Sequence, residues 1–148
     1  MDDASSTHFL DLKARFFDAL CLELGVSPCV TASGDYFAIA CADVAGMRVF
    51  FDYERGLGHF ALGAATDDRP ICSVDEIADR FPRVRSASAG EQRLSLEEQA
   101  ALIESHLLEL QAMFSPSQLP ETRAWKKRRD AAYTQRCGSA ANYRLERP

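Results

Sequence analysis

The spacing of apolar residues changes twice along this 148-residue chain, and the two changes limit the folds that it can adopt. In residues 9–24, apolar side chains recur at steps of three and four, as in an amphipathic helix; they are Phe9, Leu12, Phe16, Leu20 and Leu24. In residues 29–64 the period falls to two, which is typical of strands. Beyond residue 73 the helical spacing returns. The order predicts an α+β fold: an N-terminal helix, an antiparallel meander of three or four strands, and three helices packed on one sheet face.

The best-defined strand pair is a hairpin in residues 47–64. Alternation places two sets of three residues on one face of its strands; they are Val49, Phe51, Tyr53 and Gly58, Phe60, Leu62. Gly56 supplies the positive φ that a short hairpin turn needs. We expect the opposite sheet face to stay partly open, with Phe37, Ile39 or Phe50 on it.

Two capping boxes mark helix starts after the meander. Ser73 is followed by Glu76, and Ser95 by Glu98, so each pair can satisfy backbone donors of a first helical turn. Behind the second box, a single long helix with an apolar stripe is predicted to cover the sheet; the stripe is Leu96, Ala100, Ile103, Leu107, Leu110 and Phe114. Between these helices, residues 83–93 are polar and small, and we interpret them as a flexible loop.

The length of the chain favours a single domain over residues 1–148. We expect residues 1–6 and 138–148 to be frayed. The acidic start of the chain does not have the basic segment of a secretory signal, and no apolar stretch has the length of a membrane span. Five scattered cysteines without a C-x-x-C pair argue against a disulfide framework and against a zinc site. These features predict a cytoplasmic protein.

The net charge of −5 is unevenly distributed. Residues 1–120 hold nine basic against 19 acidic side chains, whereas residues 121–148 hold eight against three. An acidic body repels nucleic acid and attracts basic proteins. The basic segment 123–129 contains an aromatic residue, Trp125, as a nucleic-acid contact would. We favour the alternative that it lies against the protein's own acidic body.

No catalytic motif is recognisable. His8, His59 and His106 have no nucleophile or carboxylate at a spacing that identifies a triad, and phosphate-binding glycine loops are absent from the sequence. We therefore expect neither catalysis nor a cofactor or metal. One enzyme hypothesis stays open, a small hydrolase or nucleic-acid-modifying enzyme whose site joins His59, Asp52 and Cys41 across adjacent strands.

Three segments carry a resemblance to bacterial immunity proteins, the antitoxins of polymorphic-toxin and contact-dependent growth inhibition systems. They are GMRVFFDYERGLGHFALG, ICSVDEIA and SLEEQAALIESHLLELQAMF, within residues 9–115. The resemblance implies a non-catalytic protein that binds a cognate toxin domain and blocks its active site. No family motif assigns the contact residues, so we choose carboxylates by charge and expected exposure; they are Asp35, Asp43, Asp52, Glu54, Asp67 and Asp68.

A second family of protein binders is an alternative. The chain resembles type III secretion chaperones in size, acidity and its helix-then-strands beginning. That family returns to strands after its middle helix, whereas residues 94–135 here look wholly helical. Chaperones of this kind are usually dimers, and a homodimer is an open alternative for this chain.

Overall fold

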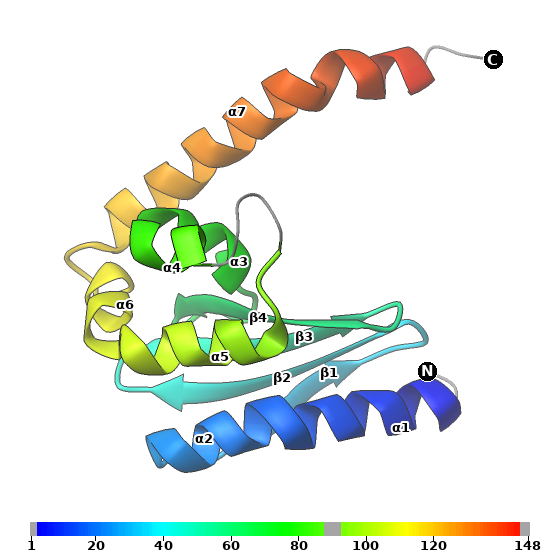
Figure 1. The fold of residues 1–148 in the computed structure, drawn as a ribbon, viewed down its shortest axis with the longest axis vertical. Helices are drawn as coiled ribbons and strands as arrows, with labels where there is room; N and C mark the ends of the chain where they lie inside the picture. Colours follow the sequence, from blue (N-terminus) through cyan, green and yellow to red (C-terminus); the bar gives the residue numbers. More distant parts are fainter. Residues whose placement is uncertain (1–2, 88–92, 146–148) are drawn as a thin grey trace.

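The computed structural model describes residues 3–87 and 93–145, with the backbone alone at residues 3, 30, 31, 85–87 and 136–145. It confirms the α+β class (Figure 1). The N-terminal helix has three parts; they are α1 (Asp3–Leu12), the π-helical segment η1 (Lys13–Asp18) and α2 (Ala19–Leu24). Gly25 ends this helix with a φ of 69°, a left-handed conformation that glycine adopts without strain.

The sheet has five antiparallel strands in the order β1-β2-β3-β4-β5, where the sequence predicts three or four. The strands are β1 (Cys29–Ser33), β2 (Phe37–Val44), β3 (Met47–Glu54), β4 (Leu57–Ala64) and β5 (Cys72–Ser73). The additional strand, β5, is a two-residue segment paired with Ala61 and Leu62. Such a segment is too short to show an alternating pattern, and that is why the sequence does not reveal it.

Two tight turns set the register of the meander. Ala45 and Gly46 have φ values of 44° and 86°, and Arg55 and Gly56 have values of 53° and 84°. Two successive positive φ values are the mark of a type I′ turn, which matches the twist of the flanking strands. The predicted role of Gly56 is confirmed.

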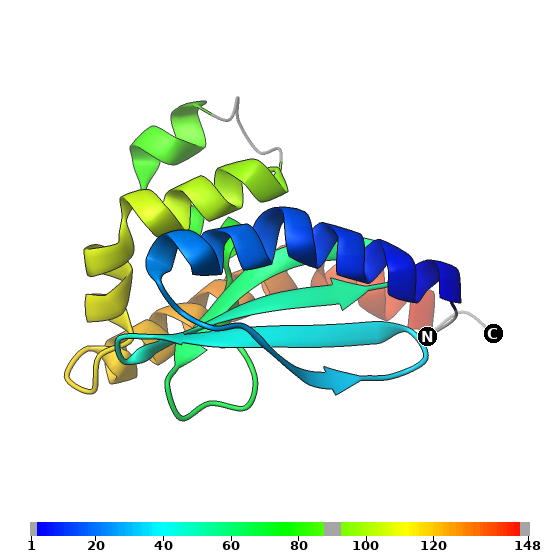
Figure 2. The same ribbon diagram turned by 90° about the horizontal axis from the view of Figure 1, so that it is seen from below.

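The helices cover one face of the sheet, which we call the inner face (Figure 2). Large buried side chains of β3 and β4 pack there against buried side chains of the N-terminal helix and of the helix after residue 95. The strand residues include Phe51, Tyr53 and Phe60, and the helix residues include Phe17, Leu20, Leu102 and Ile103. Phe17 is fully buried, whereas Phe16 from the predicted stripe is only partly buried. The π-helical segment explains this difference, since its wider turn advances the buried face by one residue.

Both predicted capping boxes are present at the starts of helices after the sheet, at Ser73 and at Ser95. Other predictions for this part of the chain need correction. The helices are α3 (Val74–Ile77), the 3-10 turn η2 (Ala78–Arg80), α4 (Pro82–Ala87), α5 (Leu96–Ser105), α6 (Leu107–Met113) and α7 (Leu119–Leu145). The predicted loop 83–93 is wrong at residues 83–87, because Pro82 occupies a first helical turn, where its missing N–H costs nothing. Residues 88–92 lie outside the described part of the chain.

The single long helix predicted from residue 96 is also wrong in part. It divides at His106, whose φ of −118° is not helical and whose ring packs 4.4 Å from the ring of Phe81. Ile103, Leu110 and Phe114 are nevertheless buried as predicted. The predicted frayed ends are helical as far as described, from Asp3 at the start and up to Leu145 at the end.

Candidate protein-binding surface

The outer face of the sheet, on the side away from the N-terminal helix and α5, carries a groove that three of the six predicted contact carboxylates line. Strand register aligns its side chains in rows across β2, β3 and β4. One row is Phe37, Glu54, Leu57; the next is Ile39, Asp52, His59; a third is Cys41, Phe50, Ala61. Phe37 and Leu57 are 40% and 66% exposed, so the first row leaves apolar surface in solvent on both sides of a carboxylate.

A groove of about 680 Å³ runs along this face. Its lining comes from three strands and from the loop between β4 and β5; it consists of Ala32, Phe37, Ile39, Arg48, Phe50, Asp52, Glu54, Asp68, Arg69 and Pro70. Of the three residues predicted to remain open, Phe37 is exposed and Ile39 half-buried, but Phe50 is fully buried. Figure 2 shows the β4–β5 loop on this side of the sheet, and Phe50 packs near its Arg69.

Asp52 is the most perturbed carboxylate of the face. Burial raises its pKa, the positive charge that His59 can carry opposes the rise, and the neighbouring charge of Glu54 adds to it. The His59 Nε2 lies 3.5 Å from the Asp52 Oδ2. Because burial disfavours the charged form of Asp52, a further cation beside it would stabilise that form.

The structure brings three of the six predicted carboxylates together and separates the other three. Asp52, Glu54 and Asp68 line the groove. Asp43 stands at the far end of β2 in an ion pair of 2.8 Å with Arg48. Asp35 is exposed in the turn before β2.

Asp67 stabilises the fold and does not line the groove. Its Oδ2 accepts a hydrogen bond from the backbone N–H of Ala64, and its Oδ1 lies 3.0 Å from Arg123 on α7. Sequence reasoning did not find Leu57 as a surface residue. The signal was present, because Leu57 faces Glu54 across the two-residue turn and must share its outward direction.

The residues of the enzyme hypothesis share the outer face, and the strand register places Cys41 one row away from Asp52 and His59. Asp52 and His59 are directly opposed, whereas Cys41 stands in the next row and packs with Phe50 and Ala61.

Burial raises the pKa of Cys21 to about 11 and that of Cys72 to about 12, so both thiols stay protonated in the core. Within residues 3–87 and 93–145, no group of three or more His, Cys, Asp or Glu side chains is placed to hold a metal ion.

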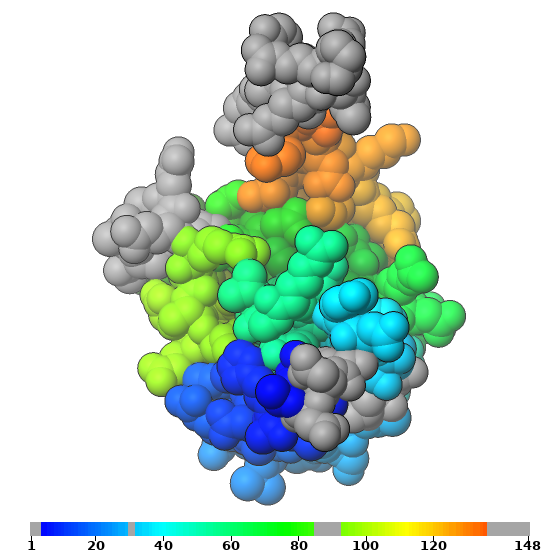
Figure 3. All heavy atoms as spheres, turned by 90° about the vertical axis from the view of Figure 1, so that its right-hand side faces the viewer, coloured from blue at the N-terminus to red at the C-terminus, as the bar shows by residue number. Residues whose placement is uncertain are grey.

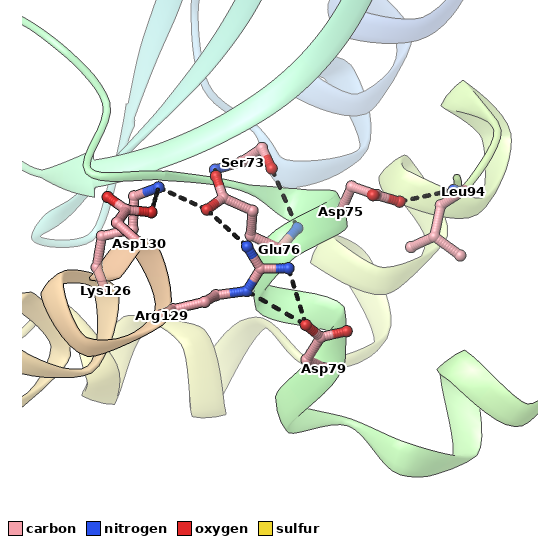
Figure 4. A network of polar contacts seen from close by, with 8 residues as sticks. All are labelled: Ser73, Asp75, Glu76, Asp79, Leu94, Lys126, Arg129 and Asp130. Atoms are coloured by element: carbon pink, nitrogen blue, oxygen red, sulfur yellow. Dashed lines mark hydrogen bonds and ion pairs between the residues drawn. The ribbon is translucent and has the colours of Figure 1, made fainter. Parts of the chain in front are cut away.

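The basic segment 123–129 lies against the acidic body, as predicted. The Lys126 Nζ lies 2.5 Å from the Glu76 Oε2, and Arg129 contacts both Glu76 at 3.2 Å and Asp79 at 3.0 Å (Figure 4). We call these ion pairs, which fasten α7 to α3 and η2, the α7 clasp. The buried Thr122 adds a hydrogen bond from its hydroxyl to the carbonyl of Met113.

Glu76 is the centre of the α7 clasp. Burial alone would raise its pKa, but hydrogen bonds from Lys126 and Ser73 outweigh burial and hold the pKa below its ordinary value of 4.5. A carboxyl with a lowered pKa in the folded state stabilises the fold above its ordinary pKa. That stabilisation is lost as the pH falls from about 4.5 through the folded-state value.

We expect Glu76→Gln to lower the free energy of unfolding at pH 7 by about 2 kcal/mol, because charge-assisted hydrogen bonds are lost. Its stability should also decline less than that of the wild type as the pH falls below the ordinary pKa of 4.5. Urea unfolding at several pH values measures both effects. Glu121→Gln, which removes an exposed pair with Arg128, is the control; an equal loss from both variants would contradict the role of the clasp.

Comparison with protein-family models, with curated proteins and with solved structures gave no match. In the described part of the chain, no helix combines the length and the apolar character needed to cross a membrane.

Proposed function

We propose that this protein is an immunity protein, which binds a cognate toxin domain through its outer sheet face and blocks the active site of that domain. The observation that carries the proposal is the groove, where Asp52, Glu54 and Asp68 stand beside exposed apolar side chains. Interface centres combine apolar anchors with a few charged groups in this way.

The α7 clasp strengthens this proposal. The clasp engages Lys126 and Arg129 of α7 with Glu76 and Asp79, so these cations do not offset the acidic surface elsewhere. A further α7 cation, Arg123, is held by Asp67 in the loop between β4 and β5. The groove itself contains two cations, and one of them, Arg48, is held by Asp43. A toxin with a basic active site, such as a nuclease, would meet a complementary potential, which speeds encounter and selects the partner.

Co-expression with the product of a neighbouring reading frame tests the proposal. If that product ends in a domain that stops growth when expressed alone, the present protein should restore growth and form a complex that size-exclusion chromatography isolates. We expect the association rate to fall at least about tenfold from low to physiological salt, as for steered association. A demonstrated toxin that still kills cells in the presence of this protein would contradict the proposal.

Charge reversal locates the surface. Glu54→Lys with Asp68→Lys should slow association strongly, because both positions line the groove. The matched control is Glu23→Lys with Glu104→Lys, which makes the same change of net charge at exposed sites on α2 and α5. Complex formation without protection from the toxin would favour a chaperone instead.

A further inference from the structure

We propose that the first two rows of the outer face form a receptor for an arginine side chain of the partner, with the guanidinium at Glu54 and Asp52 and the aliphatic stem on Phe37 and Leu57. This inference deepens the proposed function and, for its biological partner, depends on it. The partner would contact this face through a basic segment that presents arginine rather than lysine.

The register places the two carboxylates in the middle of an apolar frame. Glu54 lies between Phe37 on β2 and Leu57 on β4, and directly opposed side chains stand about 5 Å apart. Asp52 follows on the same face of β3, about 7 Å along the strand. A guanidinium with five donors in a planar fork can reach two carboxylates at such a spacing, and its stem can cover apolar surface.

Phe37 presents an exposed ring beside Gly34. Its ring lies over Gly34, where a Cβ atom would be 2.5 Å from a ring carbon, so only glycine permits this placement. Figure 3 faces this end of the molecule, where the β1–β2 and β3–β4 turns lie side by side. The N–H of Arg55 donates a hydrogen bond of 3.0 Å to the carbonyl of Tyr36 and ties the two turns together. An exposed aromatic ring offers a surface on which a guanidinium can stack.

The chain's own cations compensate the two carboxylates only in part, although Arg69 lines the same groove and Arg129 lines a hollow beside Glu54 and His59. The Arg55 Nε is 4.0 Å from the Glu54 Oε1, and the Arg55 side chain is 82% exposed, so this pair is weak. Arg48 is engaged by Asp43 and by the carbonyl of Asp67. Asp52 has His59 as a partner at 3.5 Å, and burial raises the pKa of Asp52. An incoming guanidinium supplies the missing positive charge.

A titration of the full chain followed by amide NMR tests the receptor, with N-acetyl-arginine amide as the probe. We expect saturable shift changes confined to the outer-face positions of β2, β3 and β4. The neutral N-acetyl-citrulline amide should cause none, and N-acetyl-lysine amide should bind several-fold more weakly. Glu54→Gln should weaken arginine binding about tenfold, and Phe37→Ala should weaken it too.

Glu104→Gln, which neutralises an exposed carboxylate of α5, is the matched control and should leave arginine binding unchanged. Equal shifts with citrulline, or shifts spread over all acidic positions, would overturn the receptor. So would unchanged binding in Glu54→Gln. If the wild type and Glu54→Gln with Phe37→Ala neutralise a toxin equally well, the receptor fails and the proposed function stands. If the protein binds the arginine probe but does not neutralise a demonstrated toxin, the receptor stands and the proposed function fails.

Discussion

Phe51→Ala should lower the free energy of unfolding by about 3–5 kcal/mol, the largest effect that we expect from one substitution. The Phe51 side chain is fully buried, and its ring centroid lies 5.4 Å from that of Phe60 and 5.9 Å from that of Phe17. It therefore joins both strands of the central hairpin to the N-terminal helix. Its removal leaves a cavity that the rigid hairpin cannot close, and it also removes the aromatic contacts.

Urea denaturation followed by circular dichroism measures this loss as a lower midpoint at an unchanged slope. The control is Leu108→Ala, since Leu108 is 81% exposed on α6 and should change stability by less than about 0.5 kcal/mol. A similar midpoint for Phe51→Ala and the wild type would show that the packing around this ring is not the centre of the fold.

Gln99→Met should cost about 3 kcal/mol, through a different mechanism. The buried Gln99 on α5 accepts a hydrogen bond of 2.8 Å from the N–H of Phe60 and donates one of 2.9 Å to the carbonyl of Leu94. The partner strand β5 reaches only Ala61 and Leu62, so the carboxamide replaces a strand at this point of the edge of β4. Methionine fills the space but leaves a buried donor and a buried acceptor without partners.

The same denaturation experiment applies, with amide exchange at Phe60 as a local measurement. We expect faster exchange there in Gln99→Met than the loss of global stability alone explains. Gln111→Met, at a half-exposed position of α6, is the control and should be close to neutral. Slow exchange at Phe60 in the Gln99 variant would mean that another group takes over the hydrogen bond.

Local signals predicted most of this fold. The capping boxes at Ser73 and Ser95 depend on a few neighbouring atoms, and both form as the sequence indicates. The positive φ of Gly56 and the inward direction of Phe60 are also local properties. What the sequence could not predict depends on packing between distant segments, as with the division of the long helix at His106 beside the ring of Phe81.

Part of the candidate surface was also predictable, because that part depends on local signals. Strand alternation places Asp52 and Glu54 on one face, and this follows from the sequence alone. The use of Asp67 as a partner of Ala64 and Arg123 does not, because Arg123 stands 56 residues further along the chain. Burial of Phe50 likewise requires the loop between β4 and β5, whose path has no period that a pattern could detect.

The way α7 is attached has a consequence for any study of this protein in solution. The helix is about 40 Å long at the usual rise per residue, and the contacts described for it, including those of Thr122, Lys126 and Arg129, lie in its first half. Figure 1 shows the remainder extending beyond the body. Salt weakens such pairs. An ionic-strength series would therefore change the hydrodynamic radius as well as any partner affinity, and the two must be recorded on the same sample.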